Sequence, residues 1–170
     1  GEGNEWKYLT KFGFYTGTSP YKVRFRPARN AAGFNGEAAE LSLELHLDEE
    51  WEMVDNLPVC ERNATARRVW SIPLKPDGDW SDWSEGLLTQ RVRPHVWYFA
   101  LADCAQQLRP RTQIDFEFSA KQEDGSEFSV ELYGTLAVAS CKIILGAIFL
   151  AGFMYCCFEL QRKGGSLPHV

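Results

Sequence analysis

Apolar and polar residues alternate along much of the chain before residue 133. The alternation is clearest in four runs: Tyr21/Val23/Phe25, Leu41/Leu43/Leu45/Leu47, Ile114/Phe116/Phe118 and Phe128/Val130/Leu132. Every second residue of a β-strand faces the same side, so each run predicts a strand with one buried face. Residues 6–14 and 69–72 predict further strands. Residues 96–101 are apolar on both faces and predict a strand at the centre of a sheet.

These runs amount to seven or eight strands, and helical periodicity is weak before residue 135. Asp124-Gly125-Ser126 separates the last two alternating runs and predicts a hairpin turn, because glycine accepts a positive φ without steric cost. Antiparallel strands that each have one apolar face are most economically packed as two sheets. We therefore expect an all-β fold, an antiparallel β-sandwich, over residues 1–133.

A long apolar stretch follows the predicted strands. Residues 135–158 would span ~36 Å as a helix, enough to cross a hydrocarbon core of about 30 Å. Lys142 interrupts the stretch, which leaves a buried core helix as the competing interpretation, but it lies near one end, where its long stem can reach the membrane interface. Small residues at 146, 147, 151 and 152 are typical of helices that pack against other helices in a membrane. We expect a transmembrane helix over residues 134–158, in contact with membrane lipid and with further helices of the same or another chain.

Charges that flank this segment predict its orientation. Five acidic residues precede it: Glu117, Glu123, Asp124, Glu127 and Glu131. Arg162 and Lys163 follow it and, with Lys142, are the expected membrane anchors. The domain over residues 1–133 is then luminal or extracellular, in the Golgi, elsewhere in the secretory pathway or at the plasma membrane. Residues 159–170 form a cytosolic segment, which we expect to begin a loop in a longer protein.

The cysteines and one sequon fit that topology. Cys60 and Cys104 are the only cysteine pair on the predicted luminal side. A disulfide between them would close a loop of about 44 residues and stabilise the domain by ~4 kcal/mol in the chain-entropy model. Asn63-Ala64-Thr65 is an acceptor sequence for N-glycosylation.

Composition and motifs argue against two functional classes. A net charge of −5 and a pI near 5.3 argue against a nucleic-acid partner, because phosphate binding needs clustered lysine and arginine. The three histidines are scattered, and no hydrolase, P-loop or zinc motif is present. Four carboxylates within residues 77–85 could hold calcium, but a solvated acidic loop is the favoured interpretation. We therefore expect neither an enzyme nor a bound cofactor or metal.

The same loop contains a second motif. Trp80-Ser81-Asp82-Trp83-Ser84 is similar to the WSxWS signature of type I cytokine receptors, in which cationic side chains from a neighbouring strand stack on the tryptophans. In that family the motif lies just before the last strand, whereas three predicted strands follow it here. A single-span cytokine-receptor-like or adhesion protein is therefore the alternative interpretation, beside a structural subunit of a membrane or extracellular assembly. Trp80 and Trp83 are the candidate ligand or partner surface, whereas core packing is favoured for Trp97.

A wider resemblance follows the order of three segments. These segments are residues 5–14 (EWKYLTKFGF), 21–27 (YKVRFRP) and 96–104 (VWYFALADC). Together they resemble the luminal domain of GOLD-domain seven-transmembrane proteins, in particular the branch of the intimal-thickness-related receptor. The resemblance implies a GOLD-like β-sandwich on a rhodopsin-like bundle, with a role in secretory trafficking, cargo escort or receptor-like signalling. It also implies a protein partner or cargo, although Gly13 stands where the family pattern has a cysteine.

The predicted topology is tested most directly at Asn63. If residues 1–133 lie in the lumen, the chain expressed in mammalian cells is expected to lose mass on treatment with peptide N-glycosidase. Replacing Asn63 with glutamine removes the acceptor amide and should abolish that mass shift. An Asn63 that stays unmodified in the full-length protein would count against the luminal orientation.

Overall fold

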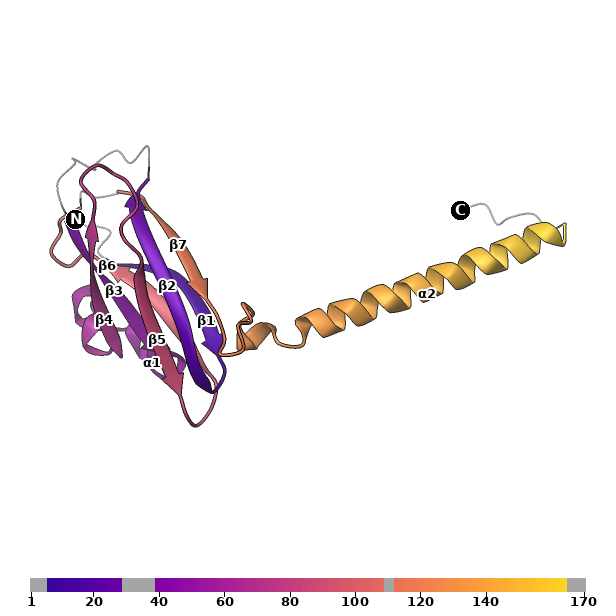
Figure 1. The fold of residues 1–170 in the computed structure, drawn as a ribbon, viewed down its shortest axis with the longest axis horizontal. Coiled ribbons are helices and arrows are strands. Elements are labelled where there is room, and N and C mark those ends of the chain that lie inside the picture. The colour runs from indigo at the N-terminus through magenta and orange to yellow at the C-terminus, as the bar shows by residue number, and fades with distance from the viewer. Residues whose placement is uncertain (1–5, 29–38, 109–111, 165–170) are drawn as a thin grey trace. The chain divides into compact units, whose positions relative to one another are not determined.

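The computed structural model describes residues 6–28, 39–108 and 112–164, and it divides into two compact units (Figure 1). The first unit, Gly1–Glu131, is a β-sandwich, and the second, Leu132–Val170, consists mainly of one long helix. This arrangement confirms the coarse prediction of an antiparallel β-fold followed by an apolar helix. Residues 165–170 of the predicted cytosolic segment lie outside the described residues.

Two antiparallel sheets form the sandwich. Their strands are β1 (Trp6–Phe14), β2 (Gly17–Pro27), β3 (Ala39–Leu47), β4 (Arg68–Leu74), β5 (Ser84–Gln90), β6 (His95–Ala102) and β7 (Ile114–Ala120). The four-stranded sheet has the order β1-β6-β3-β4, and the three-stranded sheet has the order β5-β2-β7. The strand predicted to be central, β6, lies between β1 and β3.

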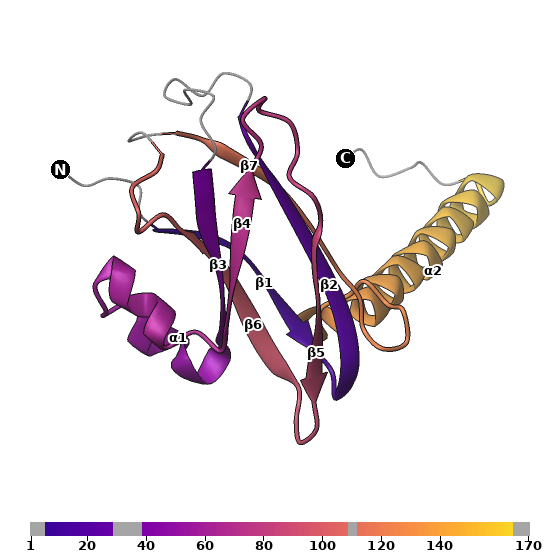
Figure 2. The same ribbon diagram turned by 60° about the vertical axis from the view of Figure 1, so that its left-hand side comes forward.

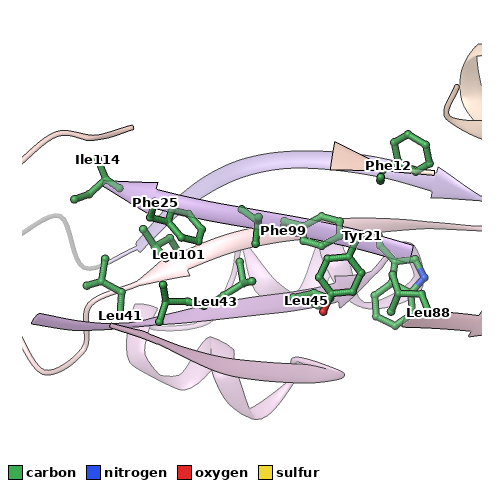
Figure 3. Close-up of a cluster of buried hydrophobic side chains, with 14 of the residues drawn as sticks. Phe12, Tyr21, Phe25, Leu41, Leu43, Leu45, Leu88, Phe99, Leu101 and Ile114 are labelled. Atoms are coloured by element: carbon green, nitrogen blue, oxygen red, sulfur yellow. The ribbon is translucent and has the colours of Figure 1, made fainter. Parts of the chain in front are cut away.

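The core lies between the two sheets. Phe25 and Ile114 from the three-stranded sheet face Leu41 and Leu43 from the four-stranded sheet (Figure 3). Phe25 and Leu43 are 0% exposed, so their full side-chain areas are withdrawn from water. Trp97 is also buried in this cluster, in agreement with the favoured interpretation.

One predicted strand is wrong. The run Phe128/Val130/Leu132 does not pair with β7; it forms a loop that ends in the 3-10 turn η2 (Val130–Leu132). The turn before it is present, with Gly125 at φ 83° and the Gln122 amide donating to the Ser126 carbonyl over 2.7 Å. After that turn the chain crosses to β1, where the Gly13 amide donates to Ser129 Oγ over 2.8 Å. Contacts with β1 therefore bury Ser129, whereas Phe128 and Leu132 of the predicted apolar side are 54% and 53% exposed.

Three elements have no counterpart among the predictions: β5, the helix α1 (Asp48–Val54) and the 3-10 helix η1 (Val59–Ala64). α1 packs on the side of β3 and β6 that faces away from the core (Figure 2). Its Trp51 ring stacks on Tyr98 with the centroids 4.2 Å apart. His46 leaves the outer face of β3, yet it is 0% exposed because α1 covers it.

The predicted disulfide is present. Cys60 lies in η1 and Cys104 lies just after β6, with Cα atoms 5.5 Å apart and 44 positions between them in sequence. The bond therefore fixes the β3–β4 connection to the end of a central strand. Cys141, Cys156 and Cys157, all in the second unit, are free thiols.

The second unit contains α2 (Thr135–Arg162), 28 residues that extend roughly 42 Å at the usual helical rise. Its most apolar window has a mean hydropathy of 2.2, so the helix is long and apolar enough to cross a membrane by length and composition. Lys142 lies in the first half of the helix. Arg162 and Lys163 lie at its end, and both pair with Glu159, at 3.7 and 3.5 Å.

Gly13 holds the crossing segment against β1. A Cβ atom at this position would lie 2.3 Å from Val130 Cγ1 and 3.1 Å from Ser129 Oγ, so only glycine lets the segment approach. Replacing Gly13 with alanine is expected to lower the free energy of unfolding by about 1–3 kcal/mol through overpacking. Chemical denaturation followed by tryptophan fluorescence measures the loss. The double variant Gly13→Ala/Val130→Ala removes the clashing methyl groups and should recover part of it; equal stability of Gly13→Ala and wild type would contradict this account.

Candidate recognition surface

β2 separates apolar from basic side chains. Tyr21, Val23 and Phe25 point into the core and are at most 2% exposed. The residues between them and after them, Lys22, Arg24 and Arg26, therefore leave the opposite face of the strand. This outer face of the three-stranded sheet carries three cations in a row at every second position.

The segment that carries Trp80 and Trp83 is attached to β2 through Ser81. The Ser81 amide donates to the Phe25 carbonyl over 2.7 Å, and Ser81 Oγ accepts the Phe25 amide hydrogen over 3.0 Å. Ser81 is 5% exposed and satisfies both backbone groups of Phe25 on this side. The loop thus extends the pairing between β5 and β2 and places the two indole rings over the outer face.

The tryptophans and the cations interleave. Trp83 lies between Lys22 and Arg24, with Lys22 Nζ 4.6 Å and the Arg24 guanidinium carbon 4.5 Å from its ring centroid. Trp80 lies between Arg24 and Arg26, at 4.8 and 4.4 Å. The order along the strand is Lys22, Trp83, Arg24, Trp80, Arg26, and we call this stack the cation–tryptophan ladder. Each contact contributes about 0.5–1 kcal/mol where it is partly exposed.

Carboxylates of β7 hold the ladder from the other side. Glu117 accepts hydrogen bonds from Arg24, with Oε2 at 2.7 Å from Nε and 2.6 Å from Nη2, and Asp115 Oδ2 lies 3.1 Å from Arg26 Nε. These residues are direct cross-strand partners in the β2–β7 register. The guanidinium groups are therefore fixed between aromatic rings and carboxylates, and their side chains stay only 29% and 24% exposed.

An open hollow continues the same face beyond Lys22. Its volume is 460 Å³, and it is lined mainly by Pro20, Lys22, Glu85, Leu87 and Lys121. These side chains offer apolar surface in the middle and both charge signs at the rim. A protein side chain or loop could enter the hollow while contacting the ladder.

Tyr21 forms part of the wall below the hollow. Its ring crosses Gly86 on β5, where a Cβ atom would lie 2.5 Å from the ring, so glycine is required at that position. Burial raises the pKa of the Tyr21 phenol, and the group stays neutral at physiological pH. Titration of Tyr21 therefore does not alter this surface near neutrality.

Helix α1 covers the outer face of the other sheet over β3 and β6. Trp6 Nε1 donates to Glu44 Oε2 over 3.0 Å, and His46 Nε2 lies 3.3 Å from the same oxygen, all beneath Trp51 of α1. Each acidic residue in the first turn of α1 is paired with a basic residue: Asp48 with His95, Glu49 with Arg93 and Glu50 with Arg67. Because α1 and its ion pairs cover this face, the outer face of the three-stranded sheet is the candidate recognition surface.

The structure brings some of the predicted site residues together and separates others. Trp80 and Trp83 share the ladder, whereas Asn63 is exposed on η1, three residues after the disulfide. Among residues 6–28, 39–108 and 112–164, no group of three metal-ligating side chains is present. Sequence reasoning missed Lys22, Arg24 and Arg26 as members of the site, although their alternation with the apolar residues of β2 was a visible signal.

No protein-family model, no curated protein and no solved structure matches the chain. The fold and the ladder therefore define its class by themselves: a disulfide-bonded antiparallel β-sandwich followed by one long apolar helix. One outer face of this sandwich carries an ordered row of cations and tryptophans, and the other is closed by a helix.

Arg24 is the centre of the ladder and offers a direct test of it. Replacing Arg24 with alanine removes two cation–π contacts and the partner of Glu117, and we expect a loss of about 1–2 kcal/mol in the free energy of unfolding. Replacing it with lysine keeps the charge but not the planar stack and should give an intermediate loss. Urea unfolding followed by tryptophan fluorescence measures both. Arg91→Ala, in the exposed β5–β6 hairpin, is the control and should have little effect; a similar loss in all three variants would contradict a specific role for the ladder.

Proposed function

We propose that this chain is the luminal recognition domain and first membrane-spanning helix of a multispanning protein of the secretory pathway, and that it binds a protein partner through the outer face of β5-β2-β7. The observation that carries the proposal is the ladder together with the adjacent 460 Å³ hollow on that face. The role is recognition in cargo escort or receptor-like signalling, without catalysis.

The chemistry of the face suits a protein partner. Tryptophan and arginine are enriched among the residues that dominate binding energy at protein interfaces. Here Trp80, Trp83 and Arg24 are already ordered by stacking and ion pairs, so binding costs little side-chain entropy. The mixed charges at the rim of the hollow would orient a partner, and its apolar floor would bury a side chain of that partner.

Membrane attachment and compartment have their own support. α2 has the length and hydropathy of a membrane span, and only residues 132–134 separate it from the first unit. A disulfide persists mainly in oxidising compartments such as the lumen of the secretory pathway. The exposed sequon at Asn63 is accessible for modification on that side. These features support a luminal domain on a membrane anchor, and the GOLD-domain seven-transmembrane resemblance supplies the framework that we propose for it.

The ladder also favours a second candidate, a single-span receptor of the cytokine-receptor type. Stacking of β2 cations on Trp80 and Trp83 is the arrangement that the WSxWS resemblance implies. However, Ser84 begins β5, and β6 and β7 follow it, whereas the family motif lies before the last strand. We therefore rank this candidate second.

Photo-crosslinking in cells tests the proposed face. A photoreactive residue at Leu87, which is 57% exposed in the hollow, is expected to form an adduct with a luminal protein. The matched position is Met53, which is 55% exposed but lies on α1 at the closed face. Lys22→Glu reverses a charge at the rim of the hollow and should reduce the Leu87 adduct several-fold. Equal labelling from both positions, or none from Leu87, would contradict binding through this face.

A further inference from the structure

β7 is an edge strand with one side unpaired. It pairs with β2 alone, and no other strand of the described chain lies on its far side. The two sheets are therefore unequal, four strands against three, and the shorter sheet ends at β7.

The direction of the β7 backbone groups follows from the hydrogen bonds of its neighbour. Phe25 uses its amide and carbonyl on the β5 side, toward Ser81. Backbone groups alternate along a strand, so those of Arg24 and Arg26 point to β7, and their cross-strand partners are Glu117 and Asp115.

The backbone amides and carbonyls of Phe116 and Phe118 consequently point away from β2, toward the open edge. Hydrogen bonds just beyond the two ends of β7 follow the same alternation. The Ala28 amide donates to the Gln113 carbonyl, and the Lys121 amide donates to the Pro20 carbonyl. The open edge thus offers the backbone donors and acceptors of Phe116 and Phe118 for pairing.

The chain begins to cover this edge and then leaves it. The bond from the Gln122 amide to the Ser126 carbonyl is the first rung of a hairpin beside β7. Continuing that register would place Glu131 opposite Glu117, and like charges at such positions are destabilising. Glu131 instead accepts a hydrogen bond from Lys11 over 2.8 Å on β1.

A hollow of 290 Å³ lies between the edges of β1 and β7. Phe12 and Phe118 line its apolar part, and Thr10, Ser119 and Glu127 are among its polar neighbours. The ring centroids of Phe12 on β1 and Phe118 on β7 lie 6.4 Å apart. An added strand could place inward-facing apolar side chains in this hollow.

The charges of β7 select the occupant. Asp115 and Glu117 leave the outer face, and their side chains are 43% and 45% exposed. Asp115 pairs with Arg26 through Oδ2, and Glu117 pairs with Arg24 through Oε2. The second oxygen of each carboxylate lies outside those pairs. A second copy of β7 would set these carboxylates beside their own equivalents and is disfavoured. We propose that the open edge of β7 binds an extended polypeptide segment of a partner protein in which basic side chains alternate with apolar ones. The basic residues pair with Asp115 and Glu117, and the apolar residues enter the hollow beside Phe118.

This inference does not depend on binding at the ladder face, and although Glu117 also pairs with Arg24 of the ladder, the test measures exchange at backbone amides of β7 that the ladder does not use. The probe is a capped peptide that copies residues 21–26, the segment that already pairs with β7 in this register. The control peptide has glutamate at its three basic positions. The full chain is held in nanodiscs, and amide hydrogen exchange is measured with and without each peptide.

The basic peptide is expected to slow exchange at the Phe116 and Phe118 amides at least roughly tenfold, and the glutamate peptide is not. Glu117→Lys should weaken binding roughly tenfold, whereas Glu52→Lys, exposed on α1, should not. If Glu117→Lys fails to fold, binding to the unmodified chain must still weaken as salt is raised. Unchanged exchange at both amides, equal protection by the two peptides, or full protection without peptide would overturn the proposal.

Discussion

The alternation along β2 divides the three-stranded sheet into a core face and a binding face. Tyr21, Val23 and Phe25 supply large buried side chains, and Lys22, Arg24 and Arg26 supply the cations between them. A slip of one residue would bury three charges and expose three core side chains, so the register is strongly specified. The core and the ladder therefore depend on the same strand and cannot vary independently.

The two outer faces differ because only one of them is covered. α1 buries Glu44 and His46 beneath Trp51, and its ion pairs and the disulfide-linked η1 hold it on the four-stranded sheet. In the described part of the chain, the outer face of the three-stranded sheet is contacted by the Trp80–Trp83 loop, which orders its cations but leaves the hollow and the β7 edge open. Binding to such a surface loses little side-chain entropy, because the side chains are already ordered before the partner arrives.

The end of the first unit is shaped by packing against β1 and not by strand pairing. Gly13 has no Cβ atom, so Val130 can pack against it, and the Gly13 amide donates to Ser129 Oγ. The Lys11 ammonium donates to the Glu131 carboxylate. The Glu131 carboxylate accepts this hydrogen bond and raises the pKa of the Lys11 ammonium, so Lys11 stays protonated through the physiological range. The same departure from β7 leaves that strand without an outer neighbour.

Period-two patterns in the sequence by themselves determined β2, β3 and β7, because burial of one face makes every second residue apolar. Continuous apolar runs determined the central strand β6 and the long apolar helix. Elimination among five cysteines likewise determined the Cys60–Cys104 pair. Only the tertiary structure decided that Glu44 and His46 are buried, since α1, which follows β3 directly in sequence, folds back over the outer face of that strand. It alone decided that residues 128–132 leave β7, because Gly13 and Lys11 offer contacts that no local pattern records. The ladder joins Trp80 and Trp83 to cations more than fifty positions away, and such contacts follow from strand pairing, not from periodicity.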